Sequence, residues 1–208
     1  MRGVSFDLDG TLASVGWRRV RLWRGLLDAP AVLGAYEPAV RALRGTRALD
    51  LHAALVSELV RRSRRPEAEV QAALARWIEG AWPRLYADAS PSPALRAALD
   101  AVDAAGLPRV VVSDHGALDK LAAMGLSGFA AVIDCGALGA YKPAPDGLWA
   151  AAATLGIPAS ELLHVGDRWD TDGLAAARAG CEFLHIRDVH RLTARLGAGL
   201  GSKDGRSP

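Results

Sequence analysis

The chain has 208 residues, half of them hydrophobic and 23% charged, with a formal net charge of +2. This length fits one domain, or one domain with a small insertion, and the composition excludes a disordered protein. The near-neutral charge argues against a protein that coats nucleic acid, and the two cysteines cannot make a disulfide framework and have no metal-ligand spacing. We find no targeting segment and no apolar stretch of the roughly 20 residues that a membrane span needs, so we expect a cytoplasmic protein with no membrane or nucleic-acid partner.

The first predicted element is a short buried strand at residues 3–6, which ends in two carboxylates. The next part of the chain, residues 14–91, has no convincing strand and contains amphipathic helical patterns at residues 32–43, 48–62 and 66–86. After it, apolar and β-branched runs predict strands at 109–113, 130–133, 162–165 and 182–186. Helical patterns lie before and between these strands at 93–105, 117–124, 145–155 and 171–179.

Strands that alternate with helices of this length indicate βαβ units. The predicted fold is therefore α/β, a Rossmann-like parallel sheet with helices on both faces, plus a small all-α cap inserted after the first strand. We assign residues 1–13 and 92–190 to the catalytic core and 14–91 to the helical cap. The glycine-rich end of the chain, 191–208, is predicted to be a largely irregular tail.

Two aspartates directly follow the first predicted strand. Asp7 and Asp9 are two residues apart, so an extended backbone points both carboxylates the same way, and Gly10 permits a sharp turn after them. Two close carboxylates repel each other unless one is protonated or a cation lies between them. One is thus a candidate nucleophile and the other a candidate acid/base. The alternative is a surface turn, in which Asp and Gly are common.

Three more candidate residues lie at or after later strands, and ligands of open α/β sheets bind at the carboxyl ends of strands. Ser113 ends a strand and can donate to a phosphoryl oxygen, or it can simply cap the next helix. Lys142, one of three lysines among 22 arginines, precedes Pro143 on a loop; the alternative is an ordinary solvated lysine. Asp167 follows a strand and is a candidate metal ligand, whereas Asp170 or Asp172 could merely begin a helix.

These four segments, in this order, resemble the haloacid dehalogenase-like (HAD) hydrolase superfamily. The matching patterns are DxDGT at residues 7–11, the strand-end serine at 113, Lys-Pro at 142–143 and GDxxxxD at 166–172. The insertion between the first two patterns is similar to the helical C1-type cap of the phosphoglycolate phosphatase-like branch.

The resemblance implies a Mg²⁺-dependent phosphatase that hydrolyses a small phosphorylated metabolite through an aspartyl-phosphate. Asp7 would attack phosphorus, and Asp9 would protonate the leaving group and then deprotonate water. The implied metal ligands are Asp7, Asp9 through its backbone carbonyl, and Asp167. Asp172 would not bind the metal itself but would position the ligands. The implied phosphate-binding residues are Thr11, Ser113, Asp114 and Lys142, of which Lys142 is also catalytic because it offsets the charge on Asp7. We expect a monomer or a homodimer.

Two acids depart from the pattern of this branch. The second pattern usually reads Ser-Asn, whereas Asp114 follows Ser113 here, and Asp170 is an additional acid in the fourth pattern. An extra acid at 114 could repel substrate, bind another residue or alter specificity.

Several related functions remain to be weighed. Family dehalogenases usually lack an acid at the position of Asp9, and phosphonate hydrolysis relies on a cap lysine, which residues 14–91 do not contain. A phosphosugar mutase would use the same two aspartates and differ by excluding water. From a different class, a non-catalytic HAD-fold binding protein would not need the complete set of site residues that this chain has.

The small net charge combines two oppositely charged parts. Residues 14–91 hold 13 arginines and no lysine against 8 acids, a net +5, while the rest of the chain carries −3. A basic cap over an acid-rich core suits an anionic substrate. We expect one of the arginines at 18, 19, 21 and 24 to contact it.

Overall fold

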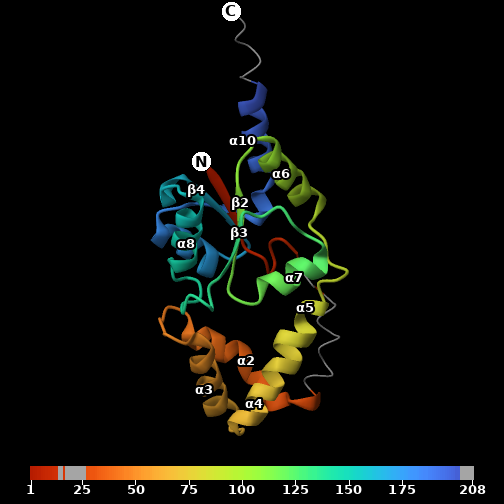
Figure 1. The fold of residues 1–208 in the computed structure, drawn as a ribbon, viewed down its shortest axis with the longest axis vertical. Coiled ribbons are helices and arrows are strands. Elements are labelled where there is room, and N and C mark those ends of the chain that lie inside the picture. Colours follow the sequence, from red (N-terminus) through yellow and green to blue (C-terminus); the bar gives the residue numbers. More distant parts are fainter. Residues whose placement is uncertain (14–15, 17–26, 202–208) are drawn as a thin grey trace, which may run out of the picture.

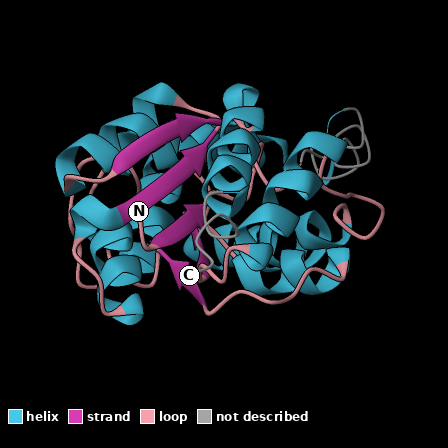
Figure 2. Cartoon of the chain, turned by 90° about the horizontal axis from the view of Figure 1, so that it is seen from above, coloured by secondary structure: helices cyan, strands magenta, loops and turns pink. Residues whose placement is uncertain are grey.

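The computed structural model describes residues 1–13, 16 and 27–201. Its five strands form one parallel sheet in the order β3-β2-β1-β4-β5, with helices packed around it (Figure 2). Their bounds are β1 Gly3–Phe6, β2 Arg109–Ser113, β3 Ala131–Asp134, β4 Leu162–Gly166 and β5 Glu182–His185. The predicted α/β Rossmann-like sheet is confirmed. Because β1 is the central strand, its carboxyl end lies between those of β2 and β4.

Both faces of the sheet are covered by helices. The helices are α6 Pro93–Ala104, α7 Ala117–Met124, α8 Asp146–Leu155, α9 Leu174–Ala179 and α10 His190–Gly201. Alternate side chains of a strand point to opposite faces. Accordingly, Val111 of β2 lies in one core cluster with residues of α6, α7 and α10, whereas Val110 and Val112 lie in another with residues of α8 and α9.

The end of the chain differs from the prediction. We expected residues 191–208 to be largely irregular, but α10 continues to Gly201. Its Leu192 and Leu196 are buried in the same core cluster as Leu95 and Leu99 of α6. This apolar contact stabilises a helix that Gly197 and Gly199 disfavour locally.

A second, all-helical part, residues 27–84, lies between β1 and α6 in the chain; we call it the helical insertion. Its helices are α2 Pro30–Leu43, α3 Leu51–Ser63, α4 Glu67–Ala73, a π-helix Leu74–Ala81 and the short α5 Trp82–Arg84. It occupies the end of the molecule opposite α10 (Figure 1) and has its own core, which includes Val40, Leu55 and Val70. The predicted helices at 32–43 and 48–62 match α2 and α3, while the one predicted at 66–86 is divided by the π-helix. The arginines at 18, 19, 21 and 24 lie outside the described residues.

The helical insertion is joined to the sheet domain by the loop after β3. Tyr141 of this loop is buried in the core of the insertion, and the backbone N–H of Ala48 donates to the carbonyl of Gly139 at 2.9 Å.

The remaining short elements are the 3₁₀ turns Ala159–Glu161 and Ile186–Asp188 and the π-helix Trp169–Gly173. Among the described residues, none of the helices has the length and apolar character required to cross a membrane.

Candidate active site

Three carboxylates meet at the carboxyl ends of β1 and β4. Asp7 directly follows β1, and Asp167 and Asp172 follow β4; each offers an oxygen within 4.8 Å of the other two. Asp7 and Asp172 are buried and Asp167 is partly buried. The fold therefore brings together two of the four predicted segments, more than 150 residues apart in the chain.

Lys142 inserts its ammonium group between two of these carboxylates. Its Nζ lies 2.6 Å from Asp7 Oδ1 and 2.6 Å from Asp172 Oδ1, and the side chain is only 4% exposed. Burial by itself would lower the pKa of Lys142, but Asp7 and Asp172 raise it well above its ordinary value. The lysine is thus a fixed positive charge and not the solvated side chain of the alternative interpretation.

Asp7 is the carboxylate of the cluster whose charged form is least favoured in the absence of a cation. The pKa of Asp7 is raised to about 8, chiefly by burial, with Lys142 acting against the rise and Asp172 adding to it. Its Oδ2 is buried and has no hydrogen-bond partner among the described residues. An orphaned carboxylate oxygen beside two further carboxylates fits a hard divalent cation such as Mg²⁺, which prefers oxygen ligands.

Two glycines allow the carboxylates to approach the backbone this closely. A Cβ at Gly10 would lie 2.3 Å from Asp167 Oδ2, and Gly10 has a φ of +99°. A Cβ at Gly166 would lie 2.5 Å from Cγ of Asp172. Glycine at these two positions is therefore a steric requirement of the cluster.

Asp172 is supported from the interior of the sheet. Its Oδ2 accepts the backbone N–H of Arg168 at 3.1 Å, and His164 Nε2 lies 3.4 Å from its Oδ1. The other ring nitrogen of His164 lies 2.9 Å from Ser5 Oγ. The additional acid Asp170 is exposed and paired with Arg168 at 2.7 Å, outside the cluster.

Asp9 points to a different set of partners. Its Oδ1 accepts a hydrogen bond from the Tyr86 hydroxyl, and its Oδ2 lies 2.5 Å from Lys120 Nζ. Neither partner was predicted from the sequence. Lys120 is one of the three lysines, so the rarity that singled out Lys142 applies to it equally. Tyr86 follows α5 and carries no comparable signal in the sequence.

Thr11 and Ser113, both predicted to bind phosphate, lie beneath the surface of the site. Thr11 is buried, and its Oγ1 has no hydrogen-bond partner among the described residues. Ser113 is fully buried at the end of β2, and its hydroxyl donates to the carbonyl of His115 at 3.2 Å. The residue that caps α7 is Gly116, so the helix-capping alternative for Ser113 does not hold.

Asp114, the extra acid of the second segment, accepts a hydrogen bond from a protein donor at each of its oxygens. Oδ1 accepts the backbone N–H of Lys142 at 2.9 Å, and Oδ2 accepts Arg44 Nη1 at 2.8 Å. The same Arg44 nitrogen donates to the carbonyl of Lys142 at 2.6 Å. The extra acid of the second segment therefore binds another residue, and it connects the end of α2 to the loop that carries Lys142.

A large cavity of about 1130 Å³ opens between the sheet domain and the helical insertion, and the carboxylate cluster forms part of its wall. Asp7, Asp9, Lys120 and Lys142 line its core side. The side of the insertion includes Tyr36, Glu37, Arg41 and His52. His115 and Tyr141 also line the cavity, and their rings pack edge-on with centroids 4.6 Å apart.

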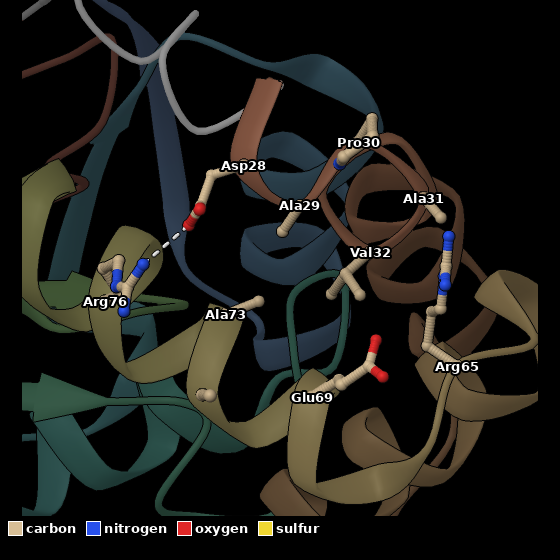
Figure 3. Close-up of a pocket in the computed structure, with 10 residues that line it drawn as sticks. Asp28, Ala29, Pro30, Ala31, Val32, Arg65, Glu69, Ala73 and Arg76 are labelled. Atoms are coloured by element: carbon tan, nitrogen blue, oxygen red, sulfur yellow. Dashed lines mark hydrogen bonds and ion pairs between the residues drawn. The ribbon is translucent and has the colours of Figure 1, made fainter.

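A second, smaller cavity of about 270 Å³ lies within the helical insertion, remote from the carboxylates (Figure 3). Arg76 reaches across it to Asp28, with 2.8 Å between Nη1 and Oδ2. It is lined by none of the residues that the four sequence segments single out.

The comparisons with known proteins agree with the fold and with the sequence patterns. The family model of the haloacid dehalogenase-like hydrolases matches residues 1–180. The chain therefore belongs to this family and is a hydrolase.

Individual relatives are more distant. The chain is 29% identical over 192 residues to a phosphoglycolate phosphatase of Neisseria gonorrhoeae, a match that covers 87% of this chain and 78% of that protein. Among solved structures it is similar to a β-phosphoglucomutase of Clostridium difficile, with a TM-score of 0.69, 14% identity and coverage of 99% and 100% of the two chains. It is also similar to a 2-haloacid dehalogenase of Pseudomonas syringae, with a TM-score of 0.64, 22% identity and coverage of 96% and 99%. At these identities the solved structures establish the fold alone.

Proposed function

We propose that this hydrolase is a Mg²⁺-dependent phosphatase that cleaves a small phosphorylated metabolite through an aspartyl-phosphate on Asp7. The observation that carries the proposal is the environment of Asp7: one carboxylate oxygen is fixed by Lys142, and the other is buried without a partner among the described residues. The name of the 29%-identical relative, a phosphoglycolate phosphatase, supports the same reaction class.

Asp7 would serve as the nucleophile. Its carboxylate lines the large cavity, so a phosphate ester bound there can reach it. A phosphate dianion is repelled by a carboxylate unless positive charge offsets both. Lys142 supplies such a charge against Asp7 Oδ1, and it would hold a phosphoryl oxygen at the same time.

Asp7 and Asp167, together with the backbone carbonyl of Asp9, would hold Mg²⁺. When bound, the cation would neutralise the phosphoryl oxygens and lower the pKa of Asp7, so that the nucleophile is ionised at neutral pH. Asp172 would keep Lys142 and the backbone at Arg168 in place behind these ligands.

Asp9 would transfer protons. It lines the same cavity as Asp7 and lies two residues further along the chain, where it can reach a leaving-group oxygen. It would protonate that oxygen as the ester bond breaks, and then remove a proton from the water that hydrolyses the aspartyl-phosphate. An acid at this position favours ester cleavage over loss of a halide, which needs no proton.

The helical insertion would act as the cap that selects the leaving group. It forms the wall of the cavity opposite the carboxylates. Within this wall Arg41 is exposed and makes no ion pair with a described residue, in contrast to Arg44 and Arg47, which are paired with Asp114 and Asp146. A guanidinium that lines the cavity without an ion pair to any described residue favours a substrate that carries a second anionic group in its leaving group.

A phosphate-release screen tests the proposal. Purified protein is assayed with sugar phosphates, phosphoglycolate, nucleotides and aryl phosphates, with Mg²⁺ and with EDTA. We expect release from at least one class only with the metal, and loss of at least about 1000-fold in kcat for Asp7→Asn. The exposed Asp170→Asn variant, which alters a carboxylate outside the cluster, serves as the matched control and should retain activity.

Two results would contradict the proposal. If the wild-type protein releases no phosphate from any ester, or if Asp7→Asn is as active as wild type, Asp7 is not the nucleophile of a phosphatase. Isomerisation of a sugar phosphate without release of phosphate would instead identify a mutase.

A further inference from the structure

Asp9 accepts hydrogen bonds from two side chains that the proposed reaction does not otherwise require. Lys120 Nζ donates to Oδ2 at 2.5 Å and also to the carbonyl of His115 at 3.1 Å. The Tyr86 hydroxyl donates to Oδ1. The ammonium group also lies 5.5 Å from the centre of the Tyr86 ring, so the two partners contact each other as well as Asp9.

Both partners are held rigidly from the core side. Lys120 is 3% exposed and Tyr86 is 1% exposed, whereas the side chain of Asp9 is 30% exposed to the cavity. Tyr86 belongs to the main core cluster beside Leu85 and Leu95. The carboxylate that faces the cavity is therefore oriented by two groups that have little freedom to move.

The buried ammonium group of Lys120 needs partners that offset its loss of hydration. Lys120 is the fourth of the eight residues of α7, and its ammonium group is buried. The carboxylate of Asp9 and one backbone carbonyl offset this loss. A salt bridge of this kind contributes little net stability compared with apolar residues of similar size.

The chemistry of the two donors makes the oxygens of Asp9 unequal. An ammonium group can only donate, so the Lys120 contact is strongest when Oδ2 carries no proton. A tyrosine hydroxyl can both donate and accept, so the Tyr86 contact survives a proton on Oδ1. The two contacts therefore hold the Asp9 carboxylate through different kinds of donor, one on each oxygen.

We infer that Lys120 and Tyr86 are positioning residues that fix the orientation of the Asp9 carboxylate for proton exchange with the leaving group. This inference rests on the proposed phosphatase function. General acid–base catalysis contributes about 10²–10⁴-fold to a rate, and a misplacement of about 1 Å can remove 10²-fold. Loss of the orientation should therefore impair cleavage of esters whose leaving group needs a proton, and spare those whose leaving group departs as a stable anion.

The test compares two substrates by kcat/KM, which reports the step in which the leaving group departs and not the later hydrolysis of the aspartyl-phosphate. One is an alkyl phosphate, with a strongly basic leaving group, and the other is 2,4-dinitrophenyl phosphate, whose leaving group requires no proton. We expect Lys120→Met to lower kcat/KM for the alkyl ester about 10- to 100-fold more than for the aryl ester. Tyr86→Phe keeps the ring and removes only the hydroxyl; it should show the same selectivity at about 3- to 10-fold.

Two reference variants show whether the effect passes through Asp9. Asp9→Asn sets the largest selectivity that loss of the acid can produce, and Lys120→Met added to Asp9→Asn should change the ratio no further. Leu118→Ala on the same helix, at a side chain 68% exposed, is the matched control and should leave both values unchanged.

The outcomes are distinguishable. A wild-type enzyme that cleaves both esters, with Lys120→Met and Tyr86→Phe lowering both kcat/KM values equally or not at all, overturns this inference alone. A wild-type protein that cleaves neither these two esters nor any ester of the screen with Mg²⁺ present overturns the proposed function and this inference with it. If Lys120→Met fails to fold, Tyr86→Phe decides.

Discussion

The bridge from Arg44 to Asp114 gives a quantitative prediction about how the helical insertion is attached. Arg44 directly follows α2, and its Nη1 donates to Asp114 Oδ2 and to the carbonyl of Lys142. Replacing Arg44 by alanine removes both hydrogen bonds and leaves a carboxylate whose side chain is 11% exposed without its counter-charge.

The expected magnitude follows from burial. Hydrogen bonds to charged groups contribute about 1.5–3 kcal/mol each, and breaking a fully buried ion pair costs about 3–5 kcal/mol. Arg44 is 18% exposed, and the Lys142 loop keeps its own bond to Asp114, so we expect Arg44→Ala to lower the free energy of unfolding by about 2–3 kcal/mol. For a chain of this size that is a fall of about 5–10 °C in Tm.

Arg47→Ala is the matched control. Arg47 also links the insertion to the sheet domain, through Asp146 at 3.0 Å, but its side chain is 64% exposed. An exposed pair contributes about 0–1 kcal/mol, so this variant should stay near the wild-type Tm.

Urea and thermal denaturation of Arg44→Ala, Asp114→Ala and the double variant measure the coupling between the two residues. We expect a coupling free energy of about 1–3 kcal/mol. The reasoning is refuted if Arg44→Ala destabilises no more than Arg47→Ala, or if the two single changes simply add.

Three further predictions concern the carboxylate cluster. Mg²⁺ at about 100 times its Kd should raise the Tm of the wild-type protein by about 5–10 °C, and Asp7→Asn should abolish most of that shift in thermal denaturation; an undiminished shift would place the metal elsewhere. Gly10→Ala should weaken Mg²⁺ activation at least about 10-fold, because its Cβ would displace Asp167, and a metal titration indistinguishable from wild type would show that the turn can relax. Burial lowers the pKa of His164, so the folded protein holds it neutral, and the stability that this contributes is present above the unfolded pKa of about 6.5 and lost as pH falls below it. The Tm of wild type should accordingly fall more between pH 7 and pH 5 than that of His164→Gln, and parallel curves would contradict this linkage.

Much of the fold could be predicted from the sequence because its signals are local. The strand at 109–113 and the helix at 117–124 were predicted with the bounds of β2 and α7, since an apolar β-branched run and a helical repeat each depend on neighbouring residues. The last helix was missed because α10 depends on packing against α6, which no local pattern reveals.

The residues of the candidate site likewise fall into those that the sequence predicts and those that it does not. Asp7, Lys142, Asp167 and Asp172 could be found from short patterns, because each follows a strand, and parallel strands bring their carboxyl ends to one edge of the sheet. The partners of these residues could not. Lys120 reaches Asp9 across 111 positions of the chain, and Arg44 reaches Asp114 across 70.

The sequence by itself determined the family pattern, the parallel sheet and the residues able to carry the chemistry. Only the tertiary structure decided what the extra acid at 114 binds, which side chains orient Asp9, and which oxygen of Asp7 is left without a partner among the described residues. The physical reason is that a local sequence pattern predicts only the secondary structure that carries a side chain. The charged groups and hydrogen-bond donors that contact that side chain belong to distant segments of the chain, and burial determines how strongly they interact with it.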